Sequence, residues 1–210
     1  MTLAGAGMGE ARRRVIVAGH TGDVDTARAG TTHPEAEVRA AALGALARLG
    51  GLGSPELAAY LAPDHEPSAM VRRRAAEIAA RFPDVALGPA LDDPEWDVVE
   101  MACWALGEHE AADDVTLHRL IDLATGHEEA LVREAAVAAL GAIGDTRGLP
   151  AILAGTRDKA PVRRRAAVSL APFDEPEADD ALRILLEDRD WQTRQIAEDL
   201  LDSRPSIDTP

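Results

Sequence analysis

Glu100 and Trp104 form one pair of side chains in this sequence that could hold a ligand. They are four residues apart, so on a helix they are neighbours on one face. A carboxylate beside an indole suits a cation or a planar base, because the face of the indole ring attracts positive charge. Cys103 is expected on the same outward side of this helix. Its acidic and apolar neighbours would raise the pKa of a thiol, so we assign it to partner contact and predict no catalytic residue.

Four further charged residues are candidates for contact with a partner: Arg73, Glu77, Glu134 and Arg164. The two arginines lie in the middle of the arginine triplets at 72–74 and 163–165. A guanidinium group binds phosphate or carboxylate groups readily. The alternative is that these side chains are solvated or paired with acidic residues one repeat away.

A repeated pattern of about 30 residues must position these side chains. Its anchors follow one another at intervals of 33, 27, 34, 30 and 31 residues: Val38, Val71, Val98, Val132, Val162 and Thr193. Every copy has alanine four positions after the anchor, and five of the six have arginine one position after it. Offsets 0, 4, 7 and 8 lie on one face of an α-helix, so these positions predict a buried stripe. The small residue at offset 4 predicts the close approach of a neighbouring helix.

Offsets 2, 5 and 6 of the same helices are expected to face away from that stripe. In the third copy they are Glu100, Cys103 and Trp104, and a large aromatic residue at offset 6 is found in no other copy. The alternative is that Trp104 fills a wide gap between repeats. Trp96 and Trp191 share offset −2, and this common register favours a structural role for both.

The charge of the chain is uneven and strongly acidic, with a formal net charge of −15. Residues 83–145 contain 15 acidic and 2 basic residues. This balance argues against broad nucleic-acid binding, which needs a basic surface, and indicates either a docking surface for a cationic partner or a device for solubility. A single cysteine excludes a disulfide framework and suits a reducing compartment. With no targeting or membrane-spanning segment in the sequence, we expect a cytoplasmic location and no membrane contact.

The strings VRAAALGAL (38–46) and VREAAVAALGAIGD (132–145) resemble HEAT-like repeats of the phycobilin-lyase type. The resemblance implies an all-α fold, an α-α superhelix (HEAT-like solenoid) of about six helical hairpins, and pairing of the offset-1 arginine with a neighbouring acidic residue. We expect a flexible N-terminus at 1–9, a single repeat domain at 10–202 and a disordered tail at 203–210. The second helices of the hairpins are expected near 35–50, 68–82, 95–107, 129–143, 160–171 and 190–201. Residues 10–30 are expected to supply the first partner helix.

The histidines of this chain do not match the metal site of a related fold. Deoxyhypusine hydroxylase, which is similar in fold, holds two iron ions with His-Glu pairs at offsets 2 and 3 of the second helices. Those offsets contain no histidine here, and the His-Glu pairs at 65–66, 109–110 and 127–128 fall in expected loops. We therefore expect no metal and no cofactor.

Two functions follow as hypotheses. The first is a non-enzymatic scaffold that binds another protein, with a cationic segment docked on the concave face at the third and fourth repeats. The second is a small-molecule or nucleobase-binding enzyme that resembles HEAT-like glycosylases or lyases. It would use Trp96, Glu100 and Trp104 as a pocket. The identity of the partner and the oligomeric state are left open.

Overall fold

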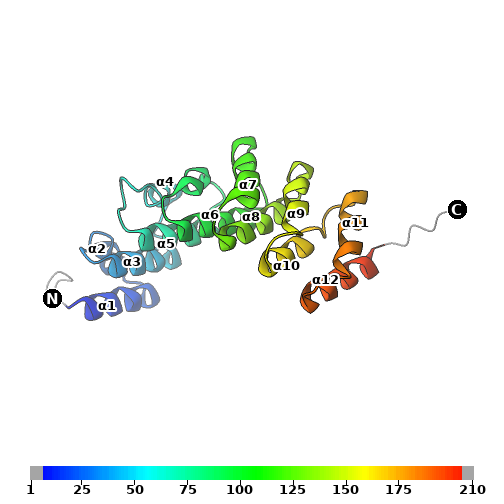
Figure 1. The fold of residues 1–210 in the computed structure, drawn as a ribbon. Coiled ribbons are helices and arrows are strands. Elements are labelled where there is room, and N and C mark those ends of the chain that lie inside the picture. The colour runs from blue at the N-terminus through cyan, green and yellow to red at the C-terminus, as the bar shows by residue number, and fades with distance from the viewer. Residues whose placement is uncertain (1–6, 205–210) are drawn as a thin grey trace. The chain divides into compact units, whose positions relative to one another are not determined.

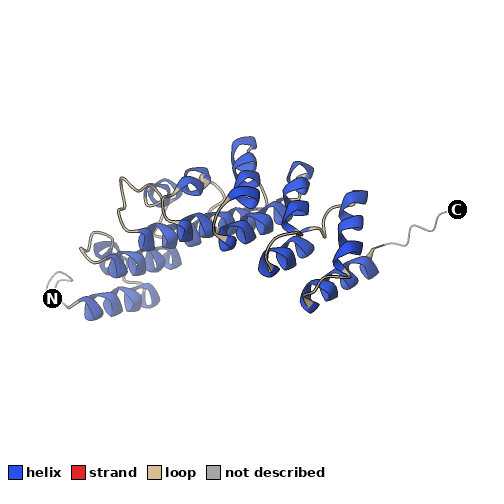
Figure 2. Ribbon diagram, viewed as in Figure 1, coloured by secondary structure: helices blue, strands red, loops and turns tan. Residues whose placement is uncertain are grey.

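The protein is described by a computed structural model that covers residues 7–204. Within this range the chain forms twelve α-helices and no strand (Figure 2). None of the helices in this range is both long and apolar enough to cross a membrane. The chain divides into two compact units, Met1–Ala105 and Leu106–Pro210. Each unit is described separately below.

The first unit places α1, α3 and α5 side by side, with α2 packed against α1 and α3, and α4 against α5 (Figure 1). Its helices are α1 (Met8–Thr21), α2 (Val24–Gly30), α3 (Ala36–Leu49), α4 (Ser54–Ala59), α5 (Ala69–Ala79), the short 3₁₀ helix η2 (Gly88–Asp92) and the start of α6 (Trp96–His109). Helices α3, α5 and α6 are the second helices of successive hairpins.

The second unit repeats this arrangement in two rows. Helices α8, α10 and α12 pack consecutively in one row, and α7, α9 and α11 form the other (Figure 1). The bounds are α7 (Asp114–Gly126), α8 (Ala130–Ile143), η3 (Thr146–Gly148), α9 (Leu149–Gly155), α10 (Ala160–Ser169), α11 (Pro176–Leu185) and α12 (Trp191–Ser203). A hairpin of this size buries its apolar face only by stacking on its neighbours.

The core follows the periodic positions of the sequence. All the anchors and all the offset-4 alanines are fully buried. A methyl group added at Gly30 of α2 would lie 3.0 Å from Cβ of Ala42, and one added at Gly155 would lie 3.2 Å from Cβ of Ala166. The alanines therefore sit where the two helices of a hairpin approach most closely, and a larger side chain would separate them.

Helix α1 is a copy of the second-helix pattern that the sequence analysis missed. Residues 10–30 do supply the first partner helix, α2, which packs against α3, but they also form most of α1, which packs along α3 as a preceding second helix would. Ala11, Val15 and Ala18 are its buried offsets 0, 4 and 7. The pattern was obscured because offset 4 is valine, and Gly19 occupies offset 8. A methyl group on Gly19 would lie 2.8 Å from Cβ of Ala45, so the glycine lets α1 and α3 approach.

The described helices reach into both segments that were expected to be flexible. Helix α1 begins at Met8, inside the segment expected to be flexible, and residues 1–6 lie outside the described range. At the other end α12 extends to Ser203, and Arg204 donates hydrogen bonds of 3.0 Å to the carbonyl oxygens of Leu170 and Phe173. The tail prediction for residues 205–210 also lies outside the described range. Arg204 therefore belongs to the packed array.

Candidate partner-binding site

The arginine at offset 1 joins consecutive repeats, as the resemblance implied. Four of the five guanidinium groups bind both oxygens of a carboxylate that precedes the next second helix, at N–O distances of 2.6–2.9 Å: Arg39–Glu66, Arg72–Asp93, Arg133–Asp158 and Arg163–Asp188. We call these four pairs the arginine ladder. Its carboxylates also accept backbone N–H bonds at the start of the next helix, such as Ser68 N–H to Glu66 at 2.9 Å. The ladder arginines are therefore structural and are not available to a partner.

Three of the ladder carboxylates are held in the charged form by their arginine partners. The hydrogen bond from Arg163 lowers the pKa of Asp188, and the hydrogen bond from Arg133 lowers that of Asp158, in both cases against the opposing effect of burial. For Glu66, burial raises the pKa, but the hydrogen bonds from Arg39 and Ser68 outweigh it and the net shift is downward. At neutral pH these pairs are therefore charged, and each one links two consecutive repeats.

Trp104 faces away from the core, as the register predicts. Its side chain is 41% exposed, and Glu100, one turn earlier, is half-buried. The prediction for Cys103 is wrong, because this residue is fully buried and cannot contact a partner. Offset 5 points toward the packed side of α6, next to the buried offset 1. Cys103 therefore contributes a small apolar side chain to the core.

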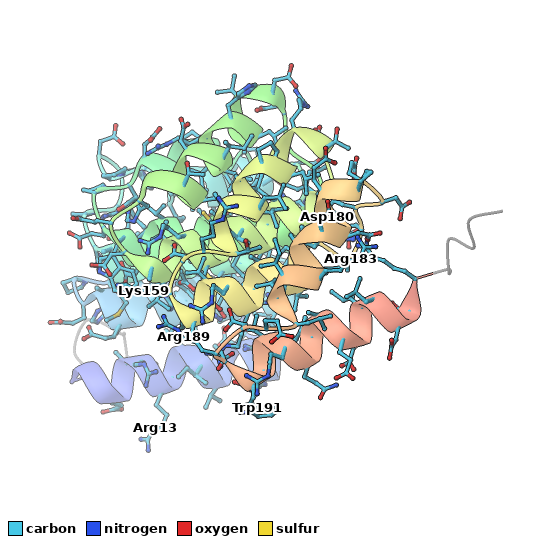
Figure 3. The ribbon with its side chains drawn as sticks, turned by 45° about the vertical axis from the view of Figure 1, so that its right-hand side comes forward. Arg13, Lys159, Asp180, Arg183, Arg189 and Trp191 are labelled. Carbon is cyan, nitrogen blue, oxygen red and sulfur yellow. The ribbon has the colours of Figure 1, made fainter. Side chains whose placement is uncertain are left out.

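The shared register of Trp96 and Trp191 is a surface position. Trp96 is 41% exposed and Trp191 is 64% exposed, and the latter projects from the start of α12 (Figure 3). The expected structural role stays a prediction for both, because each indole is partly covered and partly exposed at the start of its helix. Trp96, Glu100 and Trp104 are spaced at intervals of four along α6, which is the spacing that the nucleobase-binding hypothesis requires. Neither indole is enclosed, however, so this face is an open surface.

The other candidate residues lie in different units, Arg73 and Glu77 in the first and Glu134 and Arg164 in the second. In the first unit Arg73 is half-buried, and Glu77 pairs with Arg74 at 2.7 Å. In the second unit Glu134 and Arg164 line one groove of about 310 Å³, together with Pro161, Arg165, Val168 and Ile196. Glu134 lies 3.7 Å from Arg165 in this groove, and Arg164 donates a hydrogen bond to Gln192. The groove carries both signs of charge and is not the acidic surface that the sequence suggested.

A larger groove in the first unit was not anticipated. It has a volume of about 650 Å³ and lies on the exposed faces of α1, α3 and α5, where its charged residues are Arg12, Glu37, Arg48 and Arg74. Because α1 departs from the repeat pattern at offsets 4 and 8, the sequence alone did not align Arg12 with the outer positions of α3. The sequence did contain one indication that α1 belongs to the repeat. The three arginines that follow Ala11 occupy the same offsets as the arginine triplet at 72–74.

The described residues, 7–204, contain no cluster of histidine, cysteine and carboxylate groups suited to a metal ion. Two of the His-Glu pairs instead have structural contacts. Glu66 belongs to the arginine ladder, and Nδ1 of His127 accepts the backbone N–H of Glu129 at 3.1 Å. His33 makes the same contact with Glu35 before α3. In these repeats a histidine accepts the backbone N–H before the second helix, which a ladder carboxylate accepts in other repeats.

The chain is similar to known repeat proteins in sequence and in fold. A family model described as HEAT repeats matches residues 83–171 and 118–202, which together exceed half of the chain. No curated protein matches the sequence. Among solved structures, the CpcE–CpcF complex of phycocyanin lyase from Nostoc sp. PCC7120 matches with 23% identity and a TM-score of 0.62, covering 85% of this chain and 75% of that one.

Two designed or engineered proteins are similar to the same degree. An engineered protein has 18% identity and a TM-score of 0.62, with 86% of this chain and 97% of that chain covered. A designed armadillo repeat protein, solved with the peptide (KR)4, has 15% identity and a TM-score of 0.60, with 86% and 98% covered. At these identities the likeness shows the fold, an all-α solenoid of helical hairpins. With the sequence match, it places this chain in the HEAT-repeat family.

Proposed function

We propose that the protein is a non-enzymatic scaffold that binds a segment of another protein along the exposed face of its second helices. The observation that carries this proposal is a recurring set of exposed apolar side chains at offsets −1 and 6. They are 41–52% exposed: Val17, Met70, Trp104, Leu131 and Val168. Single exposed apolar residues are ordinary, but one of these two positions is apolar and exposed in α1, α5, α6, α8 and α10, which favours a surface in each unit that is covered by a partner.

We further propose that the partner segment is cationic where it meets α6. Residues 83–145 carry a net charge of −13, and Glu100 lies one turn from Trp104. Part of this acidity serves the fold, because Asp93 binds Arg72, Asp113 caps α7, and Asp145 binds Arg147. The remaining acidic residues would attract a basic segment and set its register. An indole beside a carboxylate also suits a lysine or arginine side chain.

The test uses the basic peptide (KR)4 labelled with a fluorophore, titrated with the full-length protein and followed by anisotropy. We expect Trp104→Ala to weaken binding at least about tenfold, since exposed tryptophan residues are frequent hot spots of interfaces. Glu100→Gln should weaken it by a smaller factor, and this loss should shrink at high salt.

The matched control is Trp191→Ala, which removes an indole that is 64% exposed on the last repeat. It should leave the affinity for (KR)4 unchanged. Equal affinities of Trp104→Ala and the unchanged protein, with both folded by circular dichroism, would show that α6 is not the docking face.

A further inference from the structure

The groove of about 650 Å³ in the first unit combines a small-residue floor with charged and apolar walls. Its floor consists of Ala40, Ala41 and Gly44 on α3. Ile16 of α1 and Met70 of α5 line it as well, and these side chains are 37% and 51% exposed. A segment laid in this groove would therefore meet apolar surface on both neighbouring helices and backbone between them.

Two glycines let arginine side chains lie across neighbouring helices at this groove. A methyl group on Gly44 would lie 2.5 Å from Nη2 of Arg74, so this guanidinium group lies directly over α3 and would have to shift if a side chain were added there. A methyl group on Gly19 would lie 2.7 Å from Nη1 of Arg48, so this side chain lies over α1 in the same way. The guanidinium groups of Arg48 and Arg74 are thus positioned by the packing of the helices.

The arginines of this groove are distinct from the arginine ladder. Within the described range, 7–204, Arg12 and Arg48 form no ion pair, and Arg74 pairs with Glu77 at 2.7 Å. Glu37 is the one carboxylate among the residues that line the groove. With Glu77 counted as the partner of Arg74, the guanidinium groups of Arg12 and Arg48 still outnumber the carboxylate of Glu37, so this groove is positive on a chain whose net charge is −15.

We propose that this groove binds an acidic segment of a partner protein, with carboxylates at Arg12, Arg48 and Arg74 and an apolar side chain against Ile16 and Met70. Guanidinium groups bind carboxylates in a planar, two-bond geometry, which suits a fixed arginine such as Arg74. Nucleic acid is the less favoured occupant, because it needs a long basic stripe and the rest of this chain is acidic. The inference rests on the scaffold function proposed above, but it concerns the groove of the first unit and not the surface of α6, and a partner segment of opposite charge.

The experiment titrates the full-length protein into a fluorophore-labelled acidic octapeptide, EELEDLEE, at low and moderate salt. We expect saturable binding that the double variant Arg12→Gln/Arg48→Gln weakens at least tenfold. Arg13→Gln is the control, since Arg13 lies on the same helix, is exposed and projects away from the neighbouring helices (Figure 3). It should change the affinity less than twofold.

A second variant separates geometry from net charge. Gly44→Ala leaves every charge in place but displaces the guanidinium group of Arg74, so it should weaken binding of the acidic peptide several-fold. Binding that responds equally to Arg13→Gln and to the double variant, or no binding at millimolar protein, would overturn the proposal. So would tighter binding of an oligothymidine, or self-association of the protein that the double variant abolishes.

The two proposals fail independently. If Trp104→Ala loses (KR)4 binding and still binds the acidic peptide, the result supports the α6 surface and does not contradict the groove proposal. If the double variant loses the acidic peptide and still binds (KR)4 with full affinity, the groove is a separate site of the same scaffold.

Discussion

Removal of one charge from the most buried pair of the arginine ladder should strongly destabilise the first unit. Nε and Nη2 of Arg72 lie 2.7 and 2.9 Å from the two carboxylate oxygens of Asp93, and the two side chains are 3% and 1% exposed. The substitution Asp93→Asn keeps the size of the side chain and an oxygen that can accept the N–H of Glu95. It leaves the guanidinium group buried without a counter-charge.

The expected loss in the free energy of unfolding is about 3 kcal/mol or more, since breaking a buried ion pair costs about 3–5 kcal/mol. With a urea m-value of about 2–3 kcal/mol/M, the midpoint should fall by roughly 1 M. Unfolding of the first unit is followed by tryptophan fluorescence in a Trp191→Phe background, so that only Trp96 and Trp104 report. This matters because repeat arrays can unfold in parts.

Two comparisons make the result decisive. Asp180→Asn removes an exposed partner of Arg183 on α11, at 2.8 Å and with side chains that are 72% and 58% exposed (Figure 3). It should cost at most about 1 kcal/mol. The double variant Arg72→Met/Asp93→Leu should be less destabilised than Asp93→Asn, because an apolar pair leaves no buried charge. If Asp93→Asn costs no more than Asp180→Asn, the ladder does not stabilise the stack as we argue.

Three further changes test the packing and the arginine ladder. Ala136→Leu should overpack the hairpin at a fully buried position and cost about 1–3 kcal/mol in a thermal melt. Gly141→Ala should also destabilise, despite the better helix propensity of alanine, because the added methyl group would lie 2.5 Å from Cβ of Ser169. Asp188→Asn should flatten the dependence of the unfolding free energy on pH. Arg163 lowers the pKa of Asp188 in the folded state. The stabilisation by this pair is therefore present above the unfolded pKa of about 3.9 and is lost as the pH falls through the folded pKa.

The two packing changes each have a control variant in the same unit. Ala138→Leu adds the same atoms at a half-buried outer position and should leave the melting temperature nearly unchanged. Gly107→Ala would place its methyl group 3.4 Å from Cα of Ala139, so the helix-propensity gain of up to about 1 kcal/mol should offset the contact. For the Arg163–Asp188 pair, the role that we propose would be contradicted if Asp188→Asn and the unchanged protein lost the same stability between pH 5 and 2.

The periodic positions could be read from the sequence because they report local chemistry. The offset-4 alanines and the anchors identify a helical stripe that must be buried, and they located the second helices α3, α5, α6, α8, α10 and α12 in the correct register. The same register predicted that Trp104 faces outward. It failed for Cys103 because offset 5 lies at the edge of the buried stripe, where the neighbouring helices decide whether a side chain is covered.

What only the tertiary structure decided is which charges meet. The partners within the arginine ladder are 21–27 residues apart and depend on the stacking of successive hairpins. The groove at Arg12, Arg48 and Arg74 depends on α1 packing as an extra second helix, and on two glycines whose missing side chains matter only once a neighbouring helix is in place. A single helix dictates its own buried face from its sequence, whereas a surface shared by three helices exists only after they are packed together.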